Sequence, residues 1–200
     1  MFKTSVSKEE LKEYSIKKFE GSITVIDNLE QVEAAVCYLE KQKIIGFDTE
    51  TRPSFKKGET NKVALLQLSS KDQAFLFRIN KIGLPKQVAN LLSDKSIIKS
   101  GAAIRDDIKA LRAITKFIPQ SFVELQSYIK TFGIESFSLT KMSAIVLGFR
   151  ISKSQQLSNW ENDTLTKAQQ TYAATDAWVG YLIYDRLVSS ATNSKKDGSI

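Results

Sequence analysis

The N-terminal part of the chain changes from a helical pattern to a strand pattern and back. Ser7 followed by Glu10 matches the S-x-x-E capping box and predicts a helix that runs to about Phe19. Residues 23–26 are mostly β-branched and predict a short strand. A second helix is predicted after it, from the cap formed by Asn28 with Gln31 and from apolar residues that share one face: Val32, Ala35, Val36 and Leu39.

The middle of the chain is rich in short apolar runs with many β-formers. They predict strands at residues 44–50, 63–69, 73–79, 96–102 and 122–125, with a polar loop at 51–61. Helices are predicted at 84–92 and 104–114, and everything after residue 125 has a helical pattern. Thr166 and Gln169 form a T-x-x-Q cap that opens a long last helix.

Three strands in series, followed by alternating helices and strands, predict an α/β fold. The order fits a ribonuclease-H-like arrangement, a mixed β-sheet flanked by helices on both faces. With no internal repeat and no break in composition, we expect residues 1–200 to form a single domain. Within it, residues 1–20 are expected to be a helical extension and residues 189–200 a frayed tail.

The composition limits the kinds of catalytic and metal-binding site that the chain can form. The chain has no His and one Cys (Cys37), which excludes a Ser-His-Asp triad, Cys/His zinc sites and internal disulfides. Acid–base or metal chemistry must therefore come from Asp, Glu, Lys, Tyr, water and bound cations. The net charge of +7 hints at an anionic partner, but many proteins carry such a charge without binding nucleic acid.

The sequence predicts no association with a membrane. No run approaches the 18 apolar residues of a membrane span, and the first 20 residues alternate Lys and Glu without the apolar core of a signal peptide. A cytoplasmic location is the default expectation. No protein partner is inferable.

Two carboxylates end the first central strand. Asp48 and Glu50 are two residues apart, so on a strand both point to the same face. Adjacent anions repel unless they are protonated, solvated or bridged by a cation, and hard oxygen ligands suit Mg²⁺ or Mn²⁺. The alternative is a chance pair on a solvated surface.

A second acidic pair, Asp106 and Asp107, follows a predicted strand and lies in the first turn of a helix. There the helix dipole stabilises carboxylates, so capping is one interpretation. The other is a ligand position at the carboxyl edge of the sheet. The motif alone leaves both open.

A third site lies inside the last predicted helix. Tyr172 and Asp176 are four residues apart and share a helical face. An Asp amid apolar residues needs a partner, which is either the Tyr hydroxyl or a metal ion. Ala173 and Ala174 would let this helix approach the sheet closely.

Taken in order, the three sites resemble the DEDD superfamily of 3′–5′ exonucleases, in the subclass with Tyr in the last motif. Asp107 is selected over Asp106 because Gly101 and Ile104 match the family's glycine and isoleucine. The chain resembles the Werner syndrome exonuclease and ribonuclease D branch over roughly residues 44–187. The matching segments are 46–50, 62–68, 122–125, 153–160, 165–166 and 172–177.

The resemblance implies a mechanism with two ions of Mg²⁺ or Mn²⁺. Asp48, Glu50 and Asp176 would hold one ion, and Asp48 would bridge to a second ion that Asp107 contacts directly or through water. Tyr172 would orient the attacking water, and the products would be nucleoside 5′-monophosphates released from nucleic-acid 3′ ends.

Substrate contacts are expected from residues that surround this cluster. Two basic segments, residues 52–62 and 95–116, flank it and suggest a channel for phosphates, although such runs are often only solvated surface. Lys153 is a candidate for phosphate contact, as is Arg52, and Trp160 is assigned to substrate binding or, more simply, to packing.

Several functional interpretations compete. DNA is slightly favoured as the substrate by the likeness to the Werner-type domain, with RNA trimming of the ribonuclease D kind as the alternative. Nothing in these residues recognises a 2′-hydroxyl. Other interpretations are a catalytically inactive nucleic-acid-binding domain, and an α/β interaction domain with coincidental carboxylates that binds no divalent cation.

Overall fold

In the computed structural model, the described residues are 2–53 and 61–197, with side chains described as far as Thr192. Six strands in this part of the chain form one mixed sheet in the order β1-β4-β3-β2-β5-β6. β3 is antiparallel to both β2 and β4, and the other neighbours are parallel. The strands are β1 (Ser22–Ile26), β2 (Ile44–Thr51), β3 (Val63–Ser69), β4 (Gln73–Phe77), β5 (Ile98–Gly101) and β6 (Phe122–Glu124).

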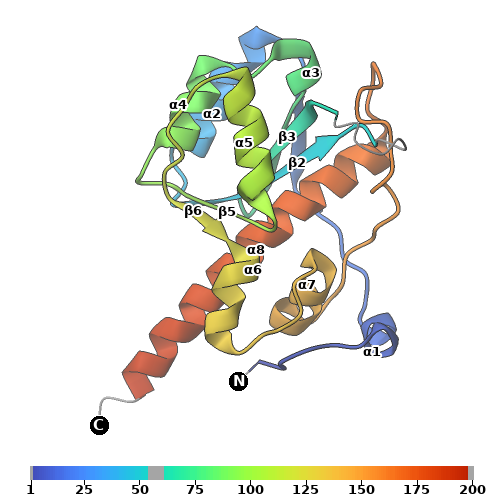
Figure 1. Ribbon diagram of the computed structural model, residues 1–200, viewed down its shortest axis with the longest axis vertical. Helices are drawn as coiled ribbons and strands as arrows, with labels where there is room; N and C mark the ends of the chain where they lie inside the picture. Colours follow the sequence, from blue (N-terminus) through green and yellow to red (C-terminus); the bar gives the residue numbers. More distant parts are fainter. Residues whose placement is uncertain (1, 54–60, 198–200) are drawn as a thin grey trace.

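Helices cover both faces of this sheet, which confirms the predicted ribonuclease-H-like α/β class (Figure 1). One face packs on α2 (Val32–Leu39), α4 (Lys86–Ser93) and α5 (Ile104–Ile114). The long α8 (Lys167–Asp197) crosses the other face and packs on α7 (Leu139–Leu147). The shorter helices are α1 (Lys8–Glu13), η1 (Leu29–Gln31), α3 (Ile79–Ile82), α6 (Leu125–Tyr128) and η2 (Ile129–Phe132).

A glycine in the central strand lets α8 approach the sheet closely. A Cβ atom on Gly46 of β2 would lie 1.7 Å from the carbonyl oxygen of Ala177 in α8. On the helix side, Ala173, Ala174 and Ala177 are completely buried. Small residues on both elements therefore fix the distance between β2 and α8, which are the two elements that carry most of the predicted site.

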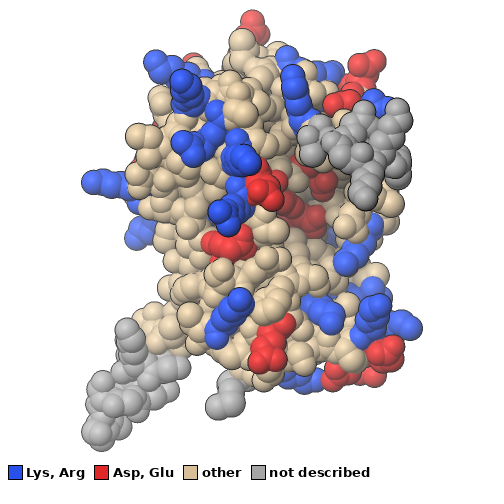
Figure 2. Space-filling model, viewed as in Figure 1, with Lys and Arg blue, Asp and Glu red and all other residues tan. Residues whose placement is uncertain are grey.

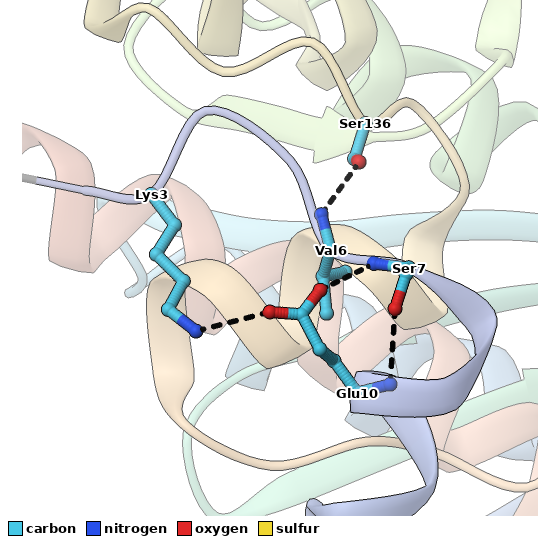
Figure 3. A network of polar contacts seen from close by, with 5 residues as sticks. All are labelled: Lys3, Val6, Ser7, Glu10 and Ser136. Carbon is cyan, nitrogen blue, oxygen red and sulfur yellow. Dashed lines mark hydrogen bonds and ion pairs between the residues drawn. The ribbon is translucent and has the colours of Figure 1, made fainter.

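The N-terminal segment docks on the loop before α7 (Figure 3). The capping box of α1 is present, because Ser7 Oγ accepts a hydrogen bond from the backbone of Glu10 at 3.1 Å and Glu10 accepts one from the backbone of Ser7 at 2.8 Å. Lys3 Nζ lies 3.5 Å from Glu10 Oε1, and the backbone nitrogen of Val6 donates to Ser136 Oγ at 3.4 Å.

The prediction that the first helix runs to Phe19 is wrong, since α1 ends at Glu13. The next residues form an extended segment, which we call the strap (residues 16–21), running past α8 (Figure 1). Its backbone pairs with Arg150 and with the side chain of Thr175, and Phe19 is buried against α8. Contacts with residues more than 130 positions away therefore override the local helical pattern.

Other predicted boundaries also need correction. The strand predicted to end at residue 79 stops at Phe77, and Ile79 begins the helical turn α3. Residues 149–166 are largely turns and extended chain, because Gly148 ends α7 in a left-handed conformation. The helix α8 continues through residue 189 as far as Asp197. Within the described residues, no helix combines the length and the hydropathy needed to cross a membrane.

Candidate active site

The central strand β2 carries the first two candidate ligands. Asp48 and Glu50 are both partly buried and lie on one face of the strand, as their spacing predicts. The backbone nitrogen of Thr49 donates to Asp48 Oδ1 at 2.9 Å, which holds this carboxylate at the strand edge. The hydroxyl of Thr49 points elsewhere, toward α5.

Asp176 reaches the same point from α8. Its side chain is 8% exposed, and one carboxylate oxygen from each of Asp48, Glu50 and Asp176 lies within 4.8 Å of the others. Residues separated by more than 120 positions thus form one acidic cluster. Its construction depends on the close packing of α8 on β2.

Asp107 lies beside this cluster, in the first turn of α5. Its Oδ1 accepts a hydrogen bond of 2.6 Å from Thr49 Oγ1, so its side chain is turned toward β2, whereas Asp106 is exposed. Electrostatic repulsion from Asp107 reaches both Asp48 and Glu50. Of this acidic pair, Asp107 is therefore the residue that lies beside the cluster.

Glu124 is a residue of this edge that the sequence interpretation missed. Its carboxylate accepts hydrogen bonds of 2.9 Å from the backbone nitrogens of Ala103 and Ile104, and so caps α5 from β6. Ala103 adopts a left-handed conformation with φ of 61°, and the cap stabilises this tight entry into the helix. The sequence signal, an acid at the end of a strand, is shared with the candidate ligands and does not separate the two roles.

Burial dominates the electrostatics of the cluster. It raises the pKa of Glu50 to about 9 and that of Asp176 to about 7, and it holds the pKa of Asp48 well above its usual range. Repulsion between the carboxylates adds to the rise for Asp48 and Glu50. Burial also raises the pKa of Asp107, against the hydrogen bond from Thr49. These groups cannot all ionise side by side without a positive charge between them.

Tyr172 lies one turn before Asp176 on α8 and interacts through its hydroxyl with that carboxylate. Burial, followed by the nearby carboxylates, raises the pKa of Tyr172 above its ordinary value, so the hydroxyl keeps its proton near neutral pH. The ring packs against Trp160 with 6.0 Å between centroids. Tyr172 can therefore donate a hydrogen bond into the cluster.

The acidic cluster opens into a pocket of about 280 Å³. We call it the acidic pocket; it is lined by Asp48, Glu50, Tyr172 and Asp176, and on its other side by residues of the 138–140 and 151–156 segments. Lys153 lies in this lining, and its charge lowers the pKa of Asp176 against the effect of burial. Of the three predicted substrate residues, Lys153 is the one that faces the acidic pocket.

The other two predicted substrate residues have different surroundings. Arg52 lies 3.6 Å from Glu161 in an exposed ion pair at the end of β2. The assignment of Trp160 to substrate binding needs correction, because its side chain is completely buried and no base can stack on it. Its contact with Tyr172 gives it a packing role instead.

Arg78, another residue that sequence reasoning missed, fixes the loop that carries Trp160. Its side chain is 1% exposed and donates hydrogen bonds to the main-chain oxygens of Asn162 and Asp163. Lys81 Nζ donates to the same oxygen of Asp163 at 2.7 Å. A buried Arg at the end of β4 thereby positions Trp160 behind Tyr172.

Lys and Arg side chains are concentrated beside the acidic side chains of the site. Figure 2 shows acidic side chains in a hollow near the middle of this face, with Lys and Arg side chains above and to the left of it, over α4 and α5. The predicted basic segment 95–116 includes α5. In the other basic segment, residues 54–60 with Lys56 and Lys57 lie outside the described residues.

Solved structures of similar fold come from nucleases. The structure is similar to the Nibbler EXO domain of Aedes aegypti, with a TM-score of 0.77 and 23% identity over 90% of this chain and 93% of that one. It is also similar to Escherichia coli RNase D, with a TM-score of 0.77 and 22% identity over 87% of this chain and 46% of that one. At these identities the comparison shows the shared fold.

Closer relatives are found by sequence. The mouse bifunctional 3′-5′ exonuclease/ATP-dependent helicase WRN is 38% identical over 151 residues, which cover 72% of this chain and 11% of that protein. The putative 3′-5′ exonuclease R431 of Acanthamoeba polyphaga mimivirus is 34% identical over 169 residues, 76% of this chain and 42% of the relative. The chain thus spans less than half the length of either relative.

The match to a family model covers more of the chain than either of these two pairwise alignments. The sequence model of the 3′-5′ exonuclease family matches residues 23–191, a stretch that includes the whole sheet from Ile23 onward, the acidic cluster and most of α8. The acidic cluster, the shared fold and this match lead to one conclusion: the chain belongs to the 3′-5′ exonuclease family.

Proposed function

We propose that the protein is a metal-dependent 3′-5′ exonuclease of the tyrosine subclass, which releases nucleoside 5′-monophosphates from nucleic-acid 3′ ends. The observation that carries the proposal is the meeting of Asp48, Glu50 and Asp176 within 4.8 Å. Family membership supports the reaction type. Tyr172, which interacts with Asp176 at the rim of the same pocket, supports the subclass.

The residues fit two divalent cations. Carboxylate oxygens are the ligands that Mg²⁺ and Mn²⁺ prefer, and the raised pKa values indicate an uncompensated negative charge that cations would balance. Asp48, Glu50 and Asp176 would hold one ion, and Asp48 with Asp107 the other. When bound, such a pair of ions neutralises the scissile phosphate, activates water and stabilises the departing 3′ oxygen.

The chain's own groups would orient the reactants. The protonated hydroxyl of Tyr172 would hold the attacking water in line with the phosphorus, because it reaches the carboxylate edge of the cluster. Lys153 faces the same pocket and would contact a non-bridging oxygen of the phosphate. Thr49 keeps the Asp107 carboxylate turned toward β2 through its 2.6 Å hydrogen bond.

Both nucleic acids are candidate substrates. The likeness to the Werner-type domain slightly favours DNA. RNA is the alternative, since Escherichia coli RNase D, a structural neighbour, is described as an exoribonuclease involved in structured RNA processing. Digestion of 5′-labelled single-stranded DNA, recessed duplex DNA and RNA of the same sequence, side by side in Mg²⁺ and Mn²⁺, decides between them.

The decisive experiment exchanges single carboxylates for amides. Asp48→Asn and Asp176→Asn should each abolish mononucleotide release, because each removes a charged ligand from the cluster. Asp106→Asn is the matched control, since that exposed neighbour of Asp107 loses the same charge outside the cluster. Wild-type activity in either cluster variant contradicts the proposal, and nucleic-acid binding without any nuclease activity favours a binding domain.

A further inference from the structure

A second pocket lies beside the acidic pocket, between the strap and α8. We call it the strap groove; its volume is about 1070 Å³, larger than the acidic pocket. The strap forms one wall, α8 from Lys167 to Leu182 forms the floor, and Lys71 and Asp72 of the β3–β4 turn close one end. The size is at the upper limit of ordinary ligand pockets, which leaves room for an extended ligand.

Hydrogen bonds hold the strap in place along both edges. The backbone nitrogen of Lys17 donates to the Arg150 oxygen at 3.0 Å, and that of Phe19 donates to Thr175 Oγ1 at 3.0 Å. At the end of the strap, the backbone nitrogen of Ser22 donates to the Asp72 oxygen at 3.0 Å. The groove is therefore built by defined contacts and not by a loosely placed tail.

The strap precedes residue 23, where the match to the 3′-5′ exonuclease family begins. One wall of the groove is thus made by a part of this chain outside the family match, whereas the floor is made by α8 inside it.

Its lining combines positive charge with aromatic surface. Lys17, Lys18, Lys71 and Lys167 are exposed at the groove and form no ion pair with a described carboxylate, while Glu20 and Asp72 are the acids of the lining. Trp178 is partly exposed in the floor, where its ring stacks on Phe149 at 5.9 Å and contacts the ring of Phe19 at 5.8 Å. Lys17 Nζ lies over the same Phe149 ring at 5.3 Å. Lysines above an aromatic floor are typical of sites that bind single-stranded nucleic acid.

The position of the strap groove indicates which part of the substrate it can bind. Ser152 and Tyr172 line both the strap groove and the acidic pocket, so the two pockets are direct neighbours. A nucleic-acid strand whose 3′-terminal nucleotide lies in the acidic pocket must leave that pocket past one of its walls. The wall at Tyr172 leads to lysines whose charges complement phosphates.

We infer that the strap groove binds the single-stranded segment that precedes the 3′-terminal nucleotide, through lysine–phosphate contacts and stacking on its aromatic floor. The inference rests on the proposed exonuclease function for the direction of the strand. The lysines read the backbone and not the sugar, so the groove accepts single-stranded DNA and RNA alike.

The test compares a groove variant with a control of equal charge. The groove variant carries Lys17→Gln, Lys18→Gln and Lys71→Gln. The control carries three exchanges of exposed lysines elsewhere: Lys8→Gln, Lys12→Gln and Lys41→Gln. Both are measured for the dissociation constant of a labelled dT12 strand and of dTMP without divalent cations, and for kcat/KM on dT12 and on the dinucleotide dTpT with Mn²⁺. Circular dichroism checks that both variants fold.

Counterion release sets the expected size of the effect. Each phosphate contact of a single strand contributes about 0.7 to the slope of log affinity against log salt, so the groove variant should lower that slope by about 2. At moderate salt we expect its affinity for dT12 to fall roughly tenfold or more. The preference in kcat/KM for dT12 over dTpT should fall by a similar factor, and the control should change much less.

Two outcomes overturn the inference. One is equal loss of dT12 affinity in the groove variant and the control, which means that the lysines act only through net charge. The other is an equal loss of affinity for dTMP and dT12, which means that the groove holds a free nucleotide. If the wild type releases no nucleotide from either substrate, the proposed function fails, and the binding measurements still decide on the groove.

Discussion

Removal of divalent cations should make the protein lose stability as the pH rises from 5 to 7. Glu50 is buried in the acidic cluster with a pKa of about 9, compared with an ordinary value of 4.5. A folded state with a raised carboxyl pKa binds its proton more tightly than the unfolded state does. Stability is therefore highest below pH 4.5 and is lost as the pH rises toward 9.

The magnitude follows from this difference. Each pH unit between the two pKa values changes the free energy of unfolding by about 1.4 kcal/mol, so Glu50 alone should remove roughly 2–3 kcal/mol between pH 5 and 7. Asp176, with a pKa of about 7, acts in the same direction, although the two groups interact and their effects do not add. Saturating Mg²⁺ should restore about 2.7 kcal/mol at a hundred times its dissociation constant.

Urea unfolding at pH 5, 6 and 7, with EDTA and with Mg²⁺, measures how the free energy of unfolding depends on pH and on the bound cation. Glu50→Gln should be roughly 2 kcal/mol more stable than the wild type at pH 7 in EDTA, and it should gain less from Mg²⁺. Glu33→Gln, an exposed exchange on α2, is the matched control. If Glu50→Gln follows the wild-type pH dependence in EDTA, Glu50 carries no strained charge and the reasoning fails.

Three further exchanges test the supports of the site. Gly46→Ala places a Cβ 1.7 Å from the Ala177 oxygen and should lower the free energy of unfolding by at least about 2 kcal/mol; an unchanged urea midpoint would show that α8 can move away freely. Tyr172→Phe should lower kcat by about 10-fold to 100-fold with little change in KM, and wild-type turnover would remove its role in positioning water. Trp160→Ala leaves a cavity behind Tyr172 and should destabilise by about 3–5 kcal/mol, measured by the same unfolding assay, whereas a loss below 1 kcal/mol would contradict its packing role.

Three of the four carboxylates could be proposed from local sequence patterns, whereas the choice of Asp107 depended on the family resemblance. The spacing of Asp48 and Glu50 fixes their common face on a strand, and the spacing of Tyr172 and Asp176 fixes theirs on a helix. Each pair needs only the correct secondary structure to be oriented. Which elements face one another, however, came from the resemblance to a known family and not from the periodicity.

What the sequence could not predict depends on distant partners. The N-terminal segment has a good helix cap at Ser7, yet the chain is extended beyond Glu13, where Arg150 and Thr175 bind the backbone of the strap. Trp160 is of a residue type that often stacks on bases. Its burial, however, depends on a loop that Arg78 anchors from the end of β4. Such contacts leave no local pattern.

The position of Asp176 is set by its two neighbours in the chain. The side chain of Thr175 accepts the backbone hydrogen bond of Phe19 from the strap, and the backbone of Ala177 rests on Gly46 of the central strand. The helix is thus held on both sides of the one residue that completes the acidic cluster. The strap, which lies outside the family match, thus helps to hold the helix that carries Asp176. The strap therefore links the groove and the acidic cluster through a single turn of α8.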